Sequence, residues 1–447
     1  MTTIRTSSSL LALAATALVS FAGAASATEG YSQNGFGARN KALAGAGVAD
    51  SRDATAGSLN PAGLVHVGDE LDVAVSVFSP RRGFTGSGAP GFTPTGEVES
   101  DRDFFFMPNL AYNTRAYKNP LFDVVNFTMI GNGGMNTSYP AVTNNGAACP
   151  GPGTGVFCAG ASGVNLMQMV MSVGFAKQIT PGIAIGVAPM FALQGFQARG
   201  IEAFGLASID PANLSGSVND WSMGGGVRGG IEISPMQNVR IGIAGTTPIW
   251  MQKFESYRGL FANQGEFDVP ASIQAGIAVD VSPQLTFMLD WRYIWFSSVD
   301  AVGNPSTNIL LCGPGPAAVN CLGGSNGPGF GWDDINVIKV AMEYRANDKL
   351  TLRAGYAWNE QPVNSRDVML NILAPAVTQH HITGGFEYVL GGGYSLEMAG
   401  MFAPKGSVSG TELPGFGNPA HNIELEMWQF DVTAGVKYKW DEPAPLK

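Results

Sequence analysis

Charged residues and long apolar runs are both scarce in this sequence. Only 13% of the 447 residues are charged, although 45% are hydrophobic. Soluble domains usually carry about 25% charged residues, so this composition disfavours an ordinary soluble fold. After the N-terminus, no apolar run reaches the roughly 18 residues that a membrane-spanning helix needs. The apolar residues alternate with polar ones instead, which is typical of a transmembrane β-barrel.

Patterns that carry catalysis or nucleic-acid binding are also missing. The four histidines, His66, His380, His381 and His421, have no Gly-x-Ser-x-Gly motif to accompany them, so a barrel lipase is only an alternative. The net charge is −10, and no basic patch indicates a nucleic-acid partner. We therefore expect neither an enzyme nor a bound cofactor.

The four cysteines form two closely spaced pairs, Cys149 with Cys158 and Cys312 with Cys321. Each pair encloses eight residues rich in Gly and Pro. Paired zinc ligands are usually separated by about two to four residues, so a metal site is not expected. An exported chain meets an oxidising compartment, which favours two local disulfides over the alternative of free thiols.

Residues 1–27 have the organisation of a secretory signal peptide. Arg5 precedes an apolar core at residues 10–19, and residues 25–27 read Ala-Ser-Ala, a typical cleavage site. The core is too short to span a membrane, which disfavours the alternative of an N-terminal anchor helix. The mature chain is therefore expected to leave the cytoplasm.

Alternation of apolar and polar residues predicts an all-β architecture from residue 71 onward. In one segment, Phe287, Leu289 and Trp291 share a face, while Asp290 and Arg292 share the other. The predicted strands are 71–78, 103–112, 123–131, 165–176, 182–194, 220–232, 238–246, 269–280, 284–297, 333–345, 349–358, 379–388, 393–403 and 426–440.

Long and short connections alternate between these segments along the chain, which favours an outer-membrane barrel over a soluble sandwich. Fourteen strands enclose a lumen that barrel side chains cannot fill. We therefore expect an antiparallel transmembrane β-barrel at residues 70–440, a small hatch at residues 28–69 inside its lumen, and a short C-terminal tail at residues 441–447.

Several motifs resemble the FadL/TodX family of outer-membrane transporters of hydrophobic compounds. Residues 47–64 read GVADSRDATAGSLNPAGL, which matches the Asp-Ala-Thr and Asn-Pro-Ala-Gly-Leu pattern near the family's N-terminus. Pro108 followed by Asn109 lies inside an apolar strand, as is usual in that family. The motifs VPASI at residues 269–273 and LTLRAGY at residues 350–356 continue the match in the same order.

The resemblance implies a monomeric fourteen-stranded barrel with an N-terminal hatch. It also implies passive uptake of long-chain fatty acids or, in some branches, aromatic hydrocarbons. In the family, the ligand leaves sideways into outer-membrane lipid through a gap in the wall, without an energy source. A water-filled porin and an adhesive barrel remain alternatives, although the match around Asn60 disfavours the porin.

The hatch and wall opening implied by the family can be assigned to particular residues. We expect the hatch turn at Asn60, Pro61 and Ala62 to lie near the opening, with a plain turn as the alternative. The predicted opening involves Pro108, Gly131, Gly133 and Gly134. Proline cannot donate to a ladder and glycines permit bends, but Pro108 could equally mark an ordinary bulge.

A fatty acid needs a cation for its carboxylate and an apolar slot for its tail. Alternation places Arg228, Arg345 and Arg353 toward the lumen, and Phe36 of the hatch is a candidate apolar contact. Cations inside a barrel are also commonly solvated or paired, so each assignment has that alternative. Loop aromatics expected to form a capture groove outside the cell are Phe84, Phe92, Phe254 and Phe261.

Overall fold

A computed structural model describes residues 29–440 except 118, 145, 147, 148, 150–152 and 217. The predicted signal peptide at residues 1–27 and the predicted C-terminal tail at residues 441–447 therefore lie outside the described residues. Within the described ranges, no helix combines the length and the hydropathy that crossing a membrane requires.

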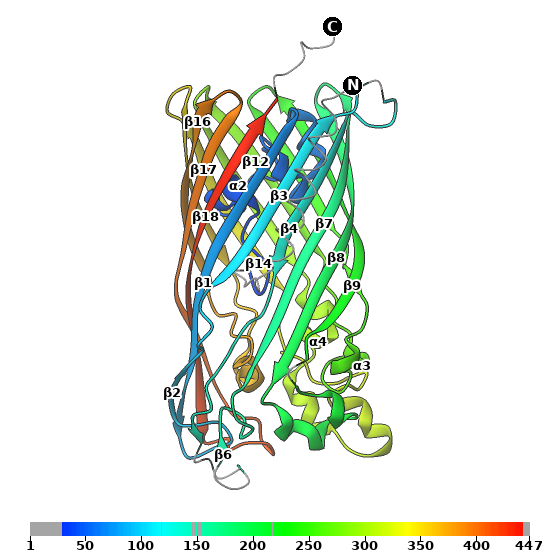
Figure 1. The fold of residues 1–447 in the computed structure, drawn as a ribbon, viewed down its shortest axis with the longest axis vertical. Coiled ribbons are helices and arrows are strands. Elements are labelled where there is room, and N and C mark those ends of the chain that lie inside the picture. The colour runs from blue at the N-terminus through cyan, green and yellow to red at the C-terminus, as the bar shows by residue number, and fades with distance from the viewer. Residues whose placement is uncertain are drawn as a thin grey trace, which may run out of the picture.

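Fourteen strands in the described part of the chain form one closed antiparallel barrel (Figure 1). Each strand pairs with the next along the chain, and β18 pairs back with β1. The barrel strands are β1 (Glu70–Gly88), β3 (Phe105–Arg115), β4 (Val124–Gly133), β7 (Gly163–Thr180), β8 (Ile183–Arg199), β9 (Asp220–Met236), β10 (Val239–Thr246), β12 (Ser272–Ser282), β13 (Leu285–Ile294), β14 (Ile335–Arg345), β15 (Leu350–Asn359), β16 (His380–Gly391), β17 (Tyr394–Thr411) and β18 (His421–Lys439). The predicted barrel of about fourteen strands is confirmed.

Strand β13 shows why the alternation in the sequence was informative. Phe287 and Leu289 are 44% and 50% exposed on the outer surface, whereas Thr286 and Asp290 are buried inside. Successive side chains of a strand point to opposite faces, so one face meets lipid and the other meets the lumen. The exposed apolar residues thus form a lipid-facing belt rather than a misplaced core.

The two ends of the barrel carry different connections. Tight turns join β7 to β8, β9 to β10, β12 to β13 and β16 to β17 at one end of the barrel, the upper end in Figure 1. Residues 391–393, at the last of these turns, are glycines with positive φ, a conformation that other residues rarely adopt. Long loops occupy the opposite end, which is the extracellular end in barrels of this kind.

The long loops contain short strands and single helical turns. These elements are β2 (Gly96–Glu99), β5 (Thr143–Asn144), β6 (Gly153–Thr154), β11 (Trp250–Met251), η3 (Glu202–Ala207), η4 (Pro211–Asn213), η5 (Glu255–Tyr257), α3 (Ala262–Gly265), η6 (Phe296–Ser298), α4 (Asp300–Gly303), η7 (Ser306–Leu311), η8 (Gly315–Asn320), η9 (Ser365–Asp367) and α5 (Val368–Asn371). Their apolar side chains form one large cluster that closes the extracellular end of the barrel.

The N-terminal segment, residues 29–69, lies inside the barrel, where Figure 1 shows it in dark blue. It contains α2 (Gly37–Ala42), η1 (Ala54–Ser58) and η2 (Pro61–His66). Asp53 and Asn60 cap the two 3-10 helices by accepting hydrogen bonds from the backbone N–H groups of Thr55 and Ala62. Caps supplied by the segment's own side chains allow such short helices to form inside the lumen.

An ion-pair network joins the N-terminal segment to the barrel wall. It contains five cations and five carboxylates, with N–O distances from 2.5 to 3.3 Å: Arg39, Arg52, Arg240, Arg353 and Lys437, and Asp50, Asp280, Glu343, Glu387 and Glu397. Three members come from the N-terminal segment, and the others come from β10, β12 and β14 to β18. Equal numbers of opposite charges allow these groups to remain ionised away from water.

We expect Glu343→Gln to destabilise the protein by about 3–5 kcal/mol, because Arg39, Arg52 and Arg353 all lose a buried carboxylate partner. The measurement is equilibrium denaturant unfolding of the full chain in detergent. Glu426→Gln is the matched control, since its partner Lys405 is solvent-exposed and such pairs contribute about 0–1 kcal/mol. Equal losses in the two variants would contradict a stabilising role for the network.

Candidate functional site

The ladder between β3 and β4 ends earlier than its neighbours, leaving a gap in the wall. Residues 109–115 of β3 pair with residues 124–130 of β4. On its other side, β3 stays paired with β1 as far as Phe105, and β4 stays paired with β7 as far as Gly133. Residues 105–108 of β3 and 131–133 of β4 therefore face each other without a ladder. We call this break the β3–β4 gap.

The start of the N-terminal segment supplies backbone partners at the β3–β4 gap. The Gln33 backbone N–H donates to the Asn132 carbonyl over 3.2 Å, and the Gly134 N–H donates to the Tyr31 carbonyl over 3.0 Å. The Gln33 side-chain amide also donates to the Gly131 carbonyl. In lipid an unpaired backbone group is costly, so these bonds satisfy groups that the missing ladder leaves open.

The structure brings together the four residues that were predicted for a wall opening. Pro108 is the first β3 residue beyond the β3–β4 ladder, and Gly131 is the first such residue of β4. A register shift between Gly131 and Gly133 interrupts the pairing of β4 with β7. Gly134 directly follows, bonded to the N-terminal segment.

The predicted hatch turn lies elsewhere on the wall. The Asn60 side-chain amide donates to the backbone carbonyls of Val48, at 2.8 Å, and Ile231 of β9, at 3.2 Å. Pro61 lies very close to Gly186 of β8. A Cβ atom on Gly186 would be only 2.4 Å from the carbonyl carbon of Pro61. Asn60, Pro61 and Ala62 are thus packed against β8 and β9, and β7 separates them from the gap.

Phe36 is the centre of an apolar cluster inside the barrel, which we call the Phe36 cluster. Its members are Phe36, Ile130, Val170, Met190, Ala192, Ile249, Met251 and Val269. Ile130 is the last β4 residue that pairs with β3, so the cluster lies directly beside the β3–β4 gap. An apolar slot and a break in the wall are therefore adjacent.

Most cations inside the barrel already have carboxylate partners. All three guanidinium nitrogens of Arg353 donate to carboxylates, those of Glu343, Glu387 and Glu397, at 2.6 to 3.1 Å. Arg345 is exposed and borders a polar cavity of about 800 Å³ at the end of the barrel with the tight turns. Neither arrangement leaves a buried, unpaired cation.

Arg228 of β9 differs from those cations. It is buried, and its guanidinium donates to two neutral groups, the Thr246 hydroxyl at 3.2 Å and the Gly57 carbonyl at 3.3 Å. Among the described residues, no carboxylate forms an ion pair with it. Arg228 pairs with Ala188 of β8, and Met190 of the Phe36 cluster is the next inward-facing residue of that strand. A cation with unused donors therefore lies beside the apolar cluster.

A small apolar cavity of about 50 Å³ lies under the extracellular loops. Every residue that lines it is apolar: Val164, Phe196, Ile201, Phe204, Leu260, Phe261, Ala301, Ile309, Leu322, Pro328, Gly329, Phe330, Leu370 and Leu373. The lining comes from four different loops and two strand ends, so no sequence motif could have identified it. We call it the extracellular cavity.

Of the four loop aromatics expected to form a capture groove, only Phe261 lines this cavity. Phe84, Phe92 and Phe254 are buried behind it. Phe92 packs edge-to-face against Phe204 of the lining, with ring centroids 5.6 Å apart. Phe92 and Phe254 therefore pack against rings of the lining and Phe84 packs against Tyr139, so none of the three forms an exposed groove.

A layer of aromatic rings separates the extracellular cavity from the Phe36 cluster. Phe261 packs against Phe267 at 4.9 Å between centroids, and Phe267 packs against Tyr31 at 6.1 Å. Tyr31 belongs to the N-terminal segment that also covers the β3–β4 gap. A ligand passing from the cavity to the cluster would have to displace these rings.

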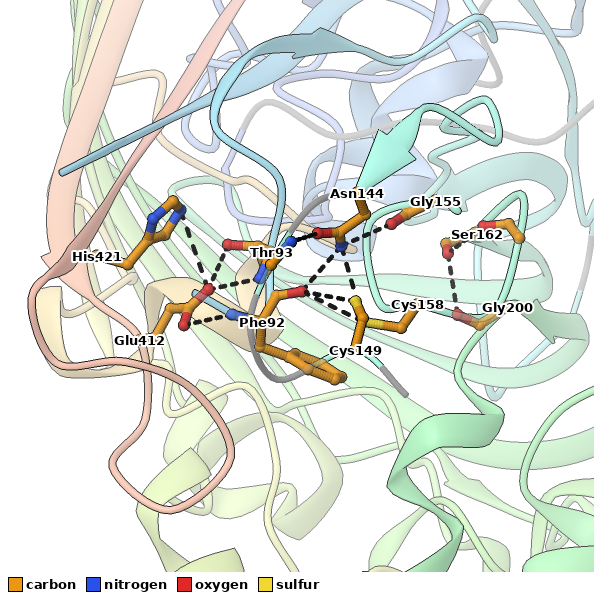
Figure 2. Close-up of a disulfide and its surroundings, with 12 residues drawn as sticks. Phe92, Thr93, Asn144, Cys149, Gly155, Cys158, Ser162, Gly200, Glu412 and His421 are labelled. Atoms are coloured by element: carbon orange, nitrogen blue, oxygen red, sulfur yellow. Dashed lines mark hydrogen bonds and ion pairs between the residues drawn. A yellow bond between two sulfur atoms is a disulfide. The ribbon is translucent and has the colours of Figure 1, made fainter. Parts of the chain in front are cut away.

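Both predicted cysteine pairs are joined in the structure. Their Cα atoms are 5.5 Å apart for Cys149–Cys158 and 4.5 Å apart for Cys312–Cys321. Figure 2 shows the first disulfide beside Phe92, whose carbonyl accepts a hydrogen bond from the Asn144 side chain at 2.9 Å. The pair therefore lies next to a ring that supports the cavity.

The buried carboxylate of Glu412 holds the loop that contains Phe92 in place. Glu412 accepts hydrogen bonds from the Phe92 N–H at 2.8 Å and from the Thr93 N–H and hydroxyl at 2.6 Å (Figure 2). Nearby, burial raises the pKa of the Tyr139 phenol, whose hydroxyl donates to the Ile372 carbonyl at 2.9 Å. The loops over the cavity are thus held by specific polar contacts.

Comparison with known proteins identifies the architecture. No family model and no curated protein matches the sequence. Among solved structures, a Pseudomonas aeruginosa FadL homologue aligns with a TM-score of 0.65 at 12% identity, covering 92% of this chain and 100% of the other. The Pseudomonas putida toluene transporter TodX gives 0.64 at 16% identity, with coverage of 92% and 100%.

The toluene transporter TbuX of Ralstonia pickettii gives a TM-score of 0.58 at 16% identity, covering 91% of this chain and 99% of the other. Identities this low establish a shared fold. The chain therefore has the architecture of FadL- and TodX-type outer-membrane barrels, as the sequence motifs suggested.

Gly133→Ala tests the close contact at the β3–β4 gap. A Cβ at this position would lie 1.9 Å from the Tyr31 carbonyl oxygen, so the N-terminal segment has to move. We expect a loss of about 1–3 kcal/mol in stability, as for other overpacked sites, and faster proteolysis of the N-terminal segment. Both are measured on the purified full chain by denaturant unfolding and limited proteolysis.

Gly131→Ala is the matched control, because a Cβ there would meet its nearest neighbour at 3.4 Å, an ordinary contact. If the two variants are digested at equal rates, the N-terminal segment is not held at the gap in the way described.

Proposed function

We propose that this protein is a passive outer-membrane channel for the uptake of hydrophobic molecules, with long-chain fatty acids as its ligands. The extracellular cavity receives the ligand, the Phe36 cluster and Arg228 hold it, and the β3–β4 gap releases it sideways into lipid. No chemical step or energy source is part of this route.

Arg228 is the observation that carries the fatty-acid assignment. Its guanidinium has no carboxylate partner among the described residues. Arg228 pairs with Ala188 of β8, which is two residues from Met190 of the Phe36 cluster. A fatty acid combines a carboxylate with a long apolar tail, and an arginine beside an apolar slot matches both parts. The other candidates differ, since Arg353 is already neutralised by three carboxylates.

Lateral release has a physical basis in the ligand's own preferences. An apolar tail gains no free energy by entering water, but it gains the hydrophobic transfer term by entering lipid. Ile130 belongs to the Phe36 cluster and is the last residue of β4 that pairs with β3, so the β3–β4 gap lies beside the cluster and offers a path to the membrane. Displacement of Tyr31 and Gln33 would open this path, and Asn60, Pro61 and Ala62 would hold the rest of the N-terminal segment in place as the hatch.

Aromatic hydrocarbons are the second candidate ligands. The solved structures of similar fold include proteins described as toluene transporters, among them TodX and TbuX. The Phe36 cluster is apolar throughout and would accept such a ligand without using Arg228. The two candidates therefore differ in whether Arg228 is needed.

Uptake of labelled oleate by bacteria that lack their own fatty-acid channel tests the proposal. We expect the intact protein to restore uptake and Arg228→Gln to lower it roughly tenfold at limiting oleate, because a hydrogen bond to a charged group contributes about 1.5–3 kcal/mol. Arg345→Gln is the matched control, since that side chain borders the polar cavity at the other end.

Labelled toluene, measured in the same cells, separates the two ligand classes. Arg228→Gln should leave toluene uptake unchanged, and Arg228→Lys should restore part of the oleate uptake by returning the charge. If the intact protein reaches the outer membrane and carries toluene but not oleate, the fatty-acid assignment fails and aromatic hydrocarbons become the ligands.

A disulfide across the β3–β4 gap tests lateral release. Continuing the β3–β4 register places Met107 opposite Asn132, beyond the last paired residues. We expect Met107→Cys combined with Asn132→Cys to abolish oleate uptake when oxidised and to recover it on reduction. The unmodified protein under the same reductant controls for its native disulfides, and undiminished uptake by the fully cross-linked variant would exclude this exit.

A further inference from the structure

The longest loop of the barrel, between β13 and β14, is free of charge over most of its length. Residues 301–332 contain no Asp, Glu, Lys, Arg or His. At the chain's average of 13%, about four charged residues would be expected in these 32 positions. Loops that face water normally carry charges, so this composition indicates a different surrounding.

Hydrogen bonds and a disulfide hold this loop in one rigid unit with the loop between β8 and β9. Cys312–Cys321 joins the end of η7 to the end of η8. The Leu322 N–H donates to the Ala207 carbonyl at 2.8 Å, and the Ile209 N–H donates to the Leu322 carbonyl at 3.0 Å. We call η3, η7 and η8, together with these connections, the leucine platform.

The leucine platform exposes large apolar side chains to solvent. Leu206 is 101% exposed and Leu311 is 62% exposed, and Ile209, Leu310 and Val319 are also exposed. The platform lies at the end of the barrel opposite the tight turns, in the green and yellow-green turns at the lower right of Figure 1. It therefore projects away from the membrane that surrounds the barrel.

The inner side of the same platform lines the extracellular cavity. Ile309, next to the exposed Leu310, and Leu322, next to Cys321, both belong to the cavity lining. Leu310 at the surface and Ile309 in the cavity lining are therefore adjacent in the chain, so the platform joins the outer surface to the wall of the cavity.

We propose that the leucine platform docks on the surface of lipid aggregates outside the cell, such as emulsion droplets, and draws ligand from them into the extracellular cavity. This inference rests on the proposed uptake of hydrophobic ligands. Its exposed side chains are apolar and come from the separate turns η3, η7 and η8, and such side chains gain the hydrophobic transfer term when they leave water for a fluid apolar phase. The absence of charge over residues 301–332 also leaves few partners for a polar protein interface.

Flotation of the purified full chain in nanodiscs with a triolein emulsion measures docking directly. We expect Leu206→Ser combined with Leu311→Ser to lower the droplet-bound fraction about tenfold, because two side chains no longer leave water on binding. Leu121→Ser combined with Leu390→Ser is the matched control, since these leucines are 78% and 61% exposed at the other end of the barrel.

Equal flotation of the two double variants, or no flotation of the intact protein, overturns the proposal. So does a platform variant that changes only the oligomeric state in analytical ultracentrifugation, because the platform would then bind a second copy of this chain.

Delivery of oleate in two forms separates docking from transport. The platform variant should take up oleate about tenfold more slowly than the intact protein from triolein emulsion, yet equally fast from albumin, which presents single molecules. Slower uptake from both sources overturns the docking role and places the two leucines in the transport path. Failure of the intact protein with both sources, despite normal flotation, refutes the proposed function while the docking surface stands.

Discussion

The ion-pair network between the N-terminal segment and the wall is the interaction on which the rest of the lumen depends. Arg39 and Asp50 of the segment are buried against Glu343 and Arg240 of the wall. Removing these charges from water is costly, and only the assembled network compensates for it. The network therefore fixes the position of the segment in the lumen. In that position Phe36 packs against the wall and Tyr31 lies at the β3–β4 gap. Within the described part of the chain, Arg228 is left with neutral hydrogen-bond partners and no carboxylate.

The gap and the segment are consequences of a single constraint, the cost of unpaired backbone in lipid. A closed barrel satisfies every strand edge, and the break beyond Asn109 and Ile130 is acceptable because Tyr31 and Gln33 provide substitute partners. A wall that depends on a separate segment for its hydrogen bonds can open when that segment moves. Register shifts between other strands, such as those of β9 with β10 and of β17 with β18, leave the strands paired on both sides of the shift, so the proposed exit is placed at the β3–β4 gap.

Much of the fold could be predicted because lipid imposes a rule on every membrane-facing strand. Residues such as Phe287 and Leu289 must alternate with residues such as Asp290, and this local pattern located all fourteen strands. The rule weakens outside the membrane, where β1 continues to Gly88, ten residues beyond its predicted end. There the loops bury side chains such as Phe84, so alternation no longer reports on lipid.

The sequence by itself determined the strands, their faces and the cysteine pairs, because each follows from neighbouring residues and from the chemistry of a barrel wall. The opening at Pro108 and Gly131 was implied by the family resemblance and stays a prediction. Only the tertiary structure decided which inward cation is unpaired, since Arg228 and Arg353 occupy equivalent positions in the strand pattern. Their difference comes from partners far along the chain, such as Glu397 for Arg353 and Gly57 for Arg228. Closure of the barrel and placement of the N-terminal segment bring those partners together, and no local pattern encodes that.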